Sequence, residues 1–265
     1  MTLIQLTIIA LIQGITEFLP ISSSGHLVLI PDLTGWRDQG LIIDVAVHLG
    51  TLGAVIIYFW RDIWMILKGL IRPGKIRRNQ GLKLVFHMFI ATLPLIIVGA
   101  IVYEQLGDSL RNAAVVGWAT LGFAILLYLA DRYNITVNRI EHMTWGRALA
   151  IGIAQTLALI PGASRAGTSI TMARSLGFER TEAARFAMLL SIPAILAAGS
   201  GATLKIIEAE MLHLLTDALF AGAIAFIASF MAVVLMMAWL KRANFTPFVI
   251  YRILLGTAIL VWVYS

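Results

Sequence analysis

The chain has 265 residues, of which 60% are hydrophobic and only 13% are charged, and its mean hydropathy is +0.90. A soluble domain of this length does not need so much apolar surface, and several runs reach the roughly 20 apolar residues that cross a bilayer. The sequence therefore predicts an integral membrane protein. It contains no cysteine, which excludes disulfides, thiolate metal sites and a cysteine nucleophile. The net charge of +6 is concentrated in one loop, so it predicts membrane topology rather than nucleic-acid binding.

Eight apolar segments follow one another along the chain, and two of them are interrupted. The first, residues 2–33, is broken at Pro20 and the serines that follow it. Three full spans come next, followed by a second broken segment, residues 145–175, and then by three more full spans. The predicted spans are 41–60, 84–103, 113–130, 183–204, 217–240 and 247–264.

Each half of a broken segment is too short to cross a membrane, and each break is too polar to face lipid. Non-helical backbone at membrane depth is tolerated only where it is buried in protein or lines a wet cavity. Both segments are therefore expected to be re-entrant helical hairpins. The predicted fold is an all-α integral membrane protein with two inverted repeats, each made of a re-entrant hairpin and three transmembrane helices.

The charges of the loops predict the topology. The loop at 61–83 holds seven basic residues and one acidic residue, so the positive-inside rule places it in the cytoplasm. Alternation outward from this loop places every net positive loop inside and every net negative loop outside. The inside loops are 61–83, 131–147, 174–185 and 241–242, and the outside loops are 31–40, 104–112 and 205–217. Both termini are therefore expected outside.

The two broken segments resemble each other, "IQGITEFLPISSSG" matching "IAQTLALIPGASRAG". Ser23 precedes Ser164 by 141 residues, and Pro20 precedes Pro161 by the same interval. Each segment is followed by three spans, and because three is odd, the second half starts from the opposite face of the membrane. The two hairpin tips should then meet near the midplane, where ligand sites form in such proteins. The predicted single membrane domain, 1–265, divides into repeats of about 1–131 and about 144–265.

Both breaks carry groups that suit an anion. In "QGITEFLPISSSGH", residues 13–26, three serines stand where a helix N-cap belongs, and Ser164 stands there in the second break. A helix N-terminus offers unpaired N–H groups and the positive end of the helix dipole, and so it binds phosphate well. Arg165 adds a positive charge and a forked set of donors that matches phosphate oxygens.

Acid–base groups flank the first break. Gln13 and Glu17 are four residues apart, so they share one face of the first half-helix, and His26 lies one turn into the next. A charge near the bilayer centre costs roughly 2.5–3.5 kcal/mol on the insertion scale, so Glu17 and Arg165 are interpreted as functional. Together these groups suit hydrolysis or transfer of a phosphoryl group, in which positioning and charge neutralisation supply most of the catalysis.

Structural interpretations compete for some of these residues. Small polar residues in membrane helices often serve only close packing, which is the alternative for Ser22 and Ser24. A purely structural ion pair is the alternative for Glu17 and Arg165. The histidines outside the two motifs, including the one at position 48, are assigned to packing. Arg252 is expected to reach the membrane interface or to pair structurally.

The two motifs resemble the signature motifs of the undecaprenyl-diphosphate phosphatase family, the bacitracin-resistance proteins. The first motif is similar to the family pattern of Glu or Gln, three residues, Glu, and then Phe-Leu-Pro and a serine run; "PGASRAGTS" is similar to the second. The resemblance covers the whole chain in length, span count and motif placement. It implies a phosphatase of the bacterial inner membrane that hydrolyses undecaprenyl (C55 isoprenoid) diphosphate to the monophosphate and inorganic phosphate. This reaction recycles the lipid carrier of peptidoglycan synthesis.

The resemblance also implies roles for single residues and an orientation. Glu17, His26 and Arg165 match the catalytic set, and the cavity is expected to face the periplasm. The residues expected to bind substrate are Gln13, Ser22, Ser23, Ser24, Gly162, Ser164 and Thr168. A divalent cation, Mg2+ or Ca2+, is expected, with Glu17 as its protein ligand. The fold allows a homodimer, but nothing in the sequence specifies one.

Two features depart from the family pattern. Gln13 stands where many members have Glu; the family pattern allows Gln, so activity is expected to survive, but metal binding with Glu17 as the only nearby acid must then depend on the substrate's own oxygens. Ala166 and Ser169 replace the usual Ser and Thr of the second motif.

The nucleophile is left open between water, His26 and Ser23. A lipid-phosphate flippase or secondary transporter that uses the same anion site is the alternative function, because inverted repeats with broken helices suit alternating access.

Overall fold

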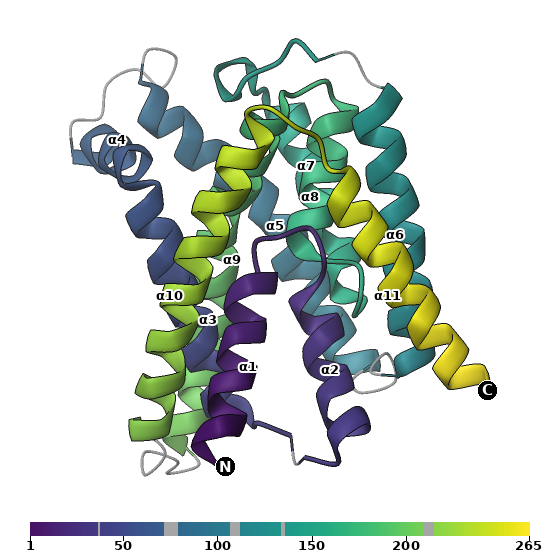
Figure 1. The fold of residues 1–265 in the computed structure, drawn as a ribbon. Coiled ribbons are helices and arrows are strands. Elements are labelled where there is room, and N and C mark those ends of the chain that lie inside the picture. The colour runs from purple at the N-terminus through teal and green to yellow at the C-terminus, as the bar shows by residue number, and fades with distance from the viewer. Residues whose placement is uncertain (37, 72–78, 107–111, 134–135, 209–214) are drawn as a thin grey trace.

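The computed structural model describes the chain except residues 37, 72–78, 107–111, 134–135 and 209–214 (Figure 1). The described part is helical. The α-helices are α1 (Leu3–Thr16), α2 (Ser23–Thr34), α3 (Leu41–Tyr58), α4 (Trp60–Ile71), α5 (Gln80–Leu106), α6 (Ala113–Tyr133), α7 (Trp145–Thr156), α8 (Arg165–Ser175), α9 (Arg180–Glu208), α10 (Leu215–Leu240) and α11 (Thr246–Tyr264). Two 3-10 turns, η3 (Ile140–His142) and η4 (Leu157–Leu159), flank α7.

Within the described residues, six helices are long and apolar enough to cross a membrane: α3, α5, α6, α9, α10 and α11. Each coincides with a predicted span to within a few residues. Large apolar side chains remain exposed on them, such as Ile97 of α5 (58% exposed) and Leu254 of α11 (66% exposed). Such surface is a liability in water but is suited to lipid. The prediction of an all-α integral membrane protein is therefore confirmed.

The helix α4 lies where the sequence predicts only a charged loop. Its tryptophans, Trp60 and Trp64, are exposed, and the charged groups of Arg61 and Lys68 lie over their rings. A helix with apolar and basic faces of this kind lies in the plane of a membrane surface. The prediction of a loop is therefore wrong for this part of 61–83. The parts of the predicted loops at 37, 72–78, 107–111, 134–135 and 209–214 lie outside the described residues.

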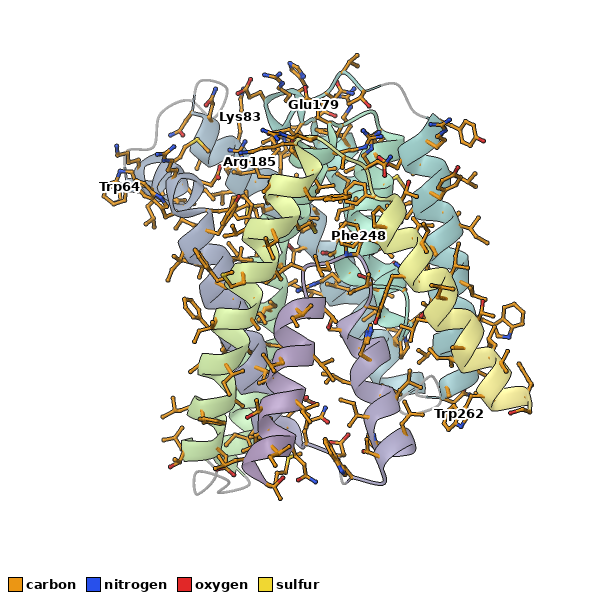
Figure 2. The ribbon with its side chains drawn as sticks, in the orientation of Figure 1. Trp64, Lys83, Glu179, Arg185, Phe248 and Trp262 are labelled. Carbon is orange, nitrogen blue, oxygen red and sulfur yellow. The ribbon has the colours of Figure 1, made fainter. Side chains whose placement is uncertain are left out.

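Two pairs of short helices occupy the broken segments. In the first pair, α1 rises from the end of the molecule that holds the N-terminus, and its connection to α2 lies near mid-height (Figure 1). In the second pair, the segments before α7 and after α8 are joined by the Arg139–Glu179 ion pair (2.9 Å), at the opposite end of the molecule (Figure 2). The predicted breaks are therefore confirmed, whereas the internal duplication stays a prediction.

A buried ionic cluster fixes the far end of α8. The Nε atoms of Arg174 and Arg180 donate to the same oxygen of Asp131, on α6, at 2.9 and 2.8 Å. The other oxygen of Asp131 accepts from the backbone N–H of Phe245, just before α11. These contacts attach the C-terminal end of α8 to α6 and to the start of α11. The position of the break, at the N-terminal end of α8, is fixed by the same contacts.

Candidate active site

The two breaks have the same local structure. Ser22 and Ser164 are the N-caps of α2 and α8, and their hydroxyls accept from the N–H groups of Gly25 and Gly167 at 3.2 and 3.1 Å. Their φ angles are 72° and 71°, a region that residues other than glycine rarely adopt. Ser164 therefore corresponds to Ser22 rather than to Ser23. The predicted interval of 141 is one short, because the second break has one more residue between its proline and its N-cap.

Arg252 of α11 joins the two breaks. Its guanidinium is fully buried and donates to the carbonyl oxygens of Pro20 (3.1 Å), Gly162 (2.9 Å), Ala163 (3.1 Å) and Thr120 (3.2 Å). Backbone carbonyls in a helix break have no intrahelical partner and need one when they are buried. Of the two expectations for Arg252, reaching the membrane interface is therefore wrong, and structural pairing is confirmed: its partners are backbone carbonyls of both breaks and of α6.

Glu17, which ends α1, receives donors from both breaks. One oxygen accepts from Nη2 of Arg165 at 2.5 Å. The other accepts from the hydroxyl of Ser23 at 2.7 Å and from the amide of Gln13 at 2.8 Å. Ser23 and Arg165 are the first residues of α2 and α8. Each helix start therefore supplies one donor to the same carboxylate, which is 8% exposed.

A cavity of about 420 Å³ lies beside this carboxylate. Its polar lining consists of Glu17, Ser22, Ser23, Ser24, Asp44, His48, Ser164 and Arg165. Its apolar lining comes mainly from α3 and α9, with further residues from α5 and η4, and includes Leu41, Val45, Leu49, Leu95, Ala194 and Ile195. An apolar wall with a few converging polar groups suits a ligand that has a charged head and a lipid tail.

His26 is not part of this lining. Its Nδ1 lies 2.7 Å from the carbonyl oxygen of Ser22, and its Nε2 lies 2.6 Å from the hydroxyl of Tyr251, whose ring stacks on the imidazole. A carbonyl can only accept, so Nδ1 carries a hydrogen, and the Tyr251 hydroxyl donates to Nε2 of a neutral ring. The catalytic role of His26 stays a prediction, and the contacts seen here join it to the N-cap of α2 and to α11.

His48 of α3, which the sequence assigned to packing, lines the cavity instead. Its side chain is 37% exposed, and its Nε2 lies 3.9 Å from an oxygen of Glu17. No local sequence pattern predicts this contact, because α3 is an ordinary apolar span outside both motifs. Only the packing of α3 against the first hairpin brings the two side chains together.

The remaining predicted residues divide into two groups. Gln13 is fully buried and lines an adjoining cavity of about 340 Å³ together with Ser24. Gly162 and Thr168 are absent from the linings of both cavities. Gly162 presents its carbonyl to the buried guanidinium of α11, and the Thr168 hydroxyl donates to the Arg165 carbonyl within α8. Their contacts support the backbone of the second break.

Comparisons of the sequence with family models and with curated proteins agree on one protein family. Residues 6–258 match the family described as bacitracin resistance protein BacA. The chain is 49% identical over 271 residues to undecaprenyl-diphosphatase 1 of Rhodospirillum rubrum, which covers all of this chain and 96% of that protein. It is 48% identical to the undecaprenyl-diphosphatase of Roseobacter denitrificans over the full length of both, and 43% identical to that of Hahella chejuensis over 100% of this chain and 99% of that protein. These matches cover nearly the whole chain, including the two motifs that meet at Glu17. The chain therefore belongs to the BacA family of bacitracin resistance proteins.

Proposed function

We propose that this protein is a phosphatase of the bacterial inner membrane that hydrolyses undecaprenyl diphosphate to the monophosphate and inorganic phosphate. The observation that carries the proposal is the carboxylate of Glu17, which receives Ser23 and Arg165 from two helix starts at the wall of a cavity with polar and apolar linings. The full-length relatives that are named undecaprenyl-diphosphatases support this substrate. The product is the form of the lipid carrier that peptidoglycan synthesis uses.

The diphosphate binds between the starts of α2 and α8. Their free N–H groups and positive dipole ends favour an anion, and the guanidinium of Arg165 adds a fork that matches two phosphate oxygens. In this structure the same guanidinium is paired with Glu17, and its Nη1 reaches the Ser191 carbonyl at 3.4 Å. An incoming phosphate therefore competes with Glu17 for Arg165, so binding of substrate loosens the carboxylate for catalysis.

Ser23 is the nucleophile that the geometry favours. Its hydroxyl already donates to Glu17 at 2.7 Å, the distance that general-base catalysis requires. Ser23 Oγ attacks the terminal phosphorus, its proton passes to Glu17, and the bond from that phosphorus to the bridging oxygen breaks. Undecaprenyl phosphate leaves, and water then cleaves the phosphoserine to give inorganic phosphate. Arg165 and the two helix starts balance the negative charge of the phosphoryl oxygens.

The described residues do not fit a metal ion that the protein holds by itself. In the part of the chain that the structure describes, no group of three or more His, Cys, Asp and Glu side chains is placed to bind a metal. Both oxygens of Glu17 already accept hydrogen bonds, and the positive charge of Arg165 beside it opposes a second cation. We therefore propose that the expected Mg2+ or Ca2+ arrives on the diphosphate oxygens of the substrate rather than on Glu17.

The distribution of charge supports a cavity that opens toward the periplasm. Lys83, Glu179 and Arg185 lie at one end of the molecule, together with the basic helix α4, and both termini lie toward the other end (Figures 1 and 2). The positive-inside rule places the basic end in the cytoplasm. The first hairpin then enters from the periplasmic side, and both termini lie on that side.

The test of this function is phosphate release from undecaprenyl diphosphate by the purified, detergent-solubilised protein. We expect release that is abolished by EDTA, when the substrate loses its cation, and by Glu17→Ala. A folded and monodisperse protein that binds the lipid and releases no phosphate would instead support the flippase or transporter alternative.

A further inference from the structure

The hydrolysis of a phosphoserine at Ser23 needs two proton-transfer groups at the same time. Attack of Ser23 leaves its proton on Glu17, and undecaprenyl phosphate leaves as an anion that needs no proton. In the second half-reaction Ser23 is the leaving group, so Glu17 must return that proton to it. Glu17 is then an acid and cannot also deprotonate the attacking water. This step, which rests on the proposed function, requires a second base.

His48 is placed to be that base. It comes from α3, a helix outside both hairpins, and it lines both cavities beside Ser23. Its Nε2 lies 3.9 Å from the Glu17 oxygen that holds the Ser23 hydroxyl. This nitrogen therefore lies close to the reacting atoms but makes no hydrogen bond to the Glu17 carboxylate.

The hydrogen-bonding of the ring selects which nitrogen can act. Nδ1 of His48 lies 2.7 Å from the backbone carbonyl of Asp44. Since a carbonyl only accepts, Nδ1 carries a hydrogen, and Nε2 of the neutral ring has a free lone pair. The Glu17 oxygen lies 3.9 Å from Nε2, a distance too long for a hydrogen bond. His26 differs, because both of its nitrogens are engaged, by Ser22 and Tyr251.

We propose that His48 is the general base of the second half-reaction. Nε2 takes a proton from the attacking water while the water oxygen bonds to phosphorus. The bond from phosphorus to Ser23 Oγ breaks, and Ser23 regains its proton from Glu17. Inorganic phosphate leaves through the cavity, and His48 then passes the water proton to solvent. Glu17 therefore acts in both half-reactions, first as a base and then as an acid, and His48 acts as the base of the second.

The test is rapid-quench kinetics with undecaprenyl diphosphate that carries 32P in its terminal phosphate. We expect His48→Gln to release about one undecaprenyl phosphate per enzyme at the rate of the unmodified protein, to retain the label on the protein, and to release inorganic phosphate at least about 100-fold more slowly. Glu17→Gln should give neither the burst nor the label. His142→Gln, which changes an exposed histidine at the far end of the molecule, is the matched control and should behave as the unmodified protein.

A second variant separates a missing base from a misfolded protein. Added imidazole should restore phosphate release to His48→Ala, because it can enter the cavity and accept the proton. Unchanged turnover in His48→Gln would overturn the proposal, as would a burst slowed in the same proportion as phosphate release. A separate outcome concerns the nucleophile: if Ser23→Ala keeps its turnover and no protein carries label, the covalent step of the proposed function fails, and this inference fails with it.

Discussion

At the scale of single residues, the site depends on a buried ion pair that is stable only as a pair. A lone charge at membrane depth is costly, and removing one member of a buried pair leaves the other uncompensated. Glu17 and Arg165 pair with each other, and the amide of Gln13 and the hydroxyl of Ser23 complete the hydrogen bonds of the carboxylate. In the proposed mechanism, the groups that hold the Glu17 carboxylate in place are the same groups that bind the phosphate and perform the attack.

Replacing Glu17 by Gln tests the carboxylate at nearly constant shape. We expect phosphate release to fall by about 10²–10⁴-fold, because the amide cannot take the proton of Ser23. The unfolding temperature should also fall, because Arg165 loses its counter-charge. Glu179→Gln is the matched control, since Glu179 pairs with exposed Arg139 at the far end of the molecule. Equal turnover in the two variants would contradict the assigned base.

Replacing Arg165 by Lys tests the fork separately from the charge. An ammonium group can neutralise Glu17 but cannot bind two phosphate oxygens side by side. We therefore expect a folded protein whose kcat/KM falls by at least about tenfold, as measured by steady-state release of phosphate. Near-normal kcat/KM would show that a point charge is sufficient at this position.

At the scale of the elements, each break depends on a serine whose backbone conformation favours glycine. Ser164 caps α8 from φ 71°, so glycine would lose the hydroxyl but gain a relaxed backbone. Loss of an N-cap to alanine costs about 1 kcal/mol, and to glycine only a few tenths; glycine also avoids a left-handed penalty of about 1–2 kcal/mol. We expect Ser164→Gly to be more stable to heat than Ser164→Ala. The order should reverse at Ser175, which lies inside the last turn of α8.

The guanidinium of Arg252 holds the two breaks against each other. Hydrogen bonds to charged groups contribute about 1.5–3 kcal/mol each, and this side chain donates to four carbonyls. Arg252→Met should therefore lower the unfolding temperature sharply and reduce phosphate release, since Ser23 and Arg165 lose their relative position. The matched control is Arg242→Met, because Arg242 is exposed and lies between α10 and α11. This variant should change neither the unfolding temperature nor phosphate release. A variant of Arg252 that unfolds like the unmodified protein would exclude this role.

The elements also show what the sequence can and cannot predict. The spans and the two breaks follow from apolar runs and from proline, glycine and serine, which act locally. The sequence offers the ion pair of Glu17 with Arg165 only as the structural alternative to a functional role, and the structure shows that the two side chains do pair. The roles of Arg252 and His48 depend on the packing of α11 and α3 against the hairpins, and no local pattern records that packing. The helix α4 is not predicted, because the basic residues of its region are typical of a charged loop.

At the scale of the whole molecule, orientation decides which pool of lipid the cavity can reach. The first hairpin enters from the end that holds both termini, and the Arg139–Glu179 pair marks the opposite end (Figures 1 and 2). If the cavity opens to the periplasm, the enzyme would act on undecaprenyl diphosphate that is released on that side after the lipid carrier has delivered its cargo. The orientation is therefore a functional property and not only a topological one.

The absence of cysteine makes this orientation directly measurable. Ser265 is the last residue of the chain, and Glu141 lies two residues from Arg139, whose ion pair with Glu179 marks the opposite end (Figures 1 and 2). Both positions are exposed, so each is suitable for a single cysteine. In spheroplasts, a membrane-impermeant maleimide should label Ser265→Cys at once, but Glu141→Cys only after the membrane is permeabilised. The unmodified chain should take no label, and retained phosphate release would show that each variant is folded. The opposite pattern of labelling would place the termini and the first hairpin on the cytoplasmic side, and the enzyme would then act on lipid diphosphate in the inner leaflet.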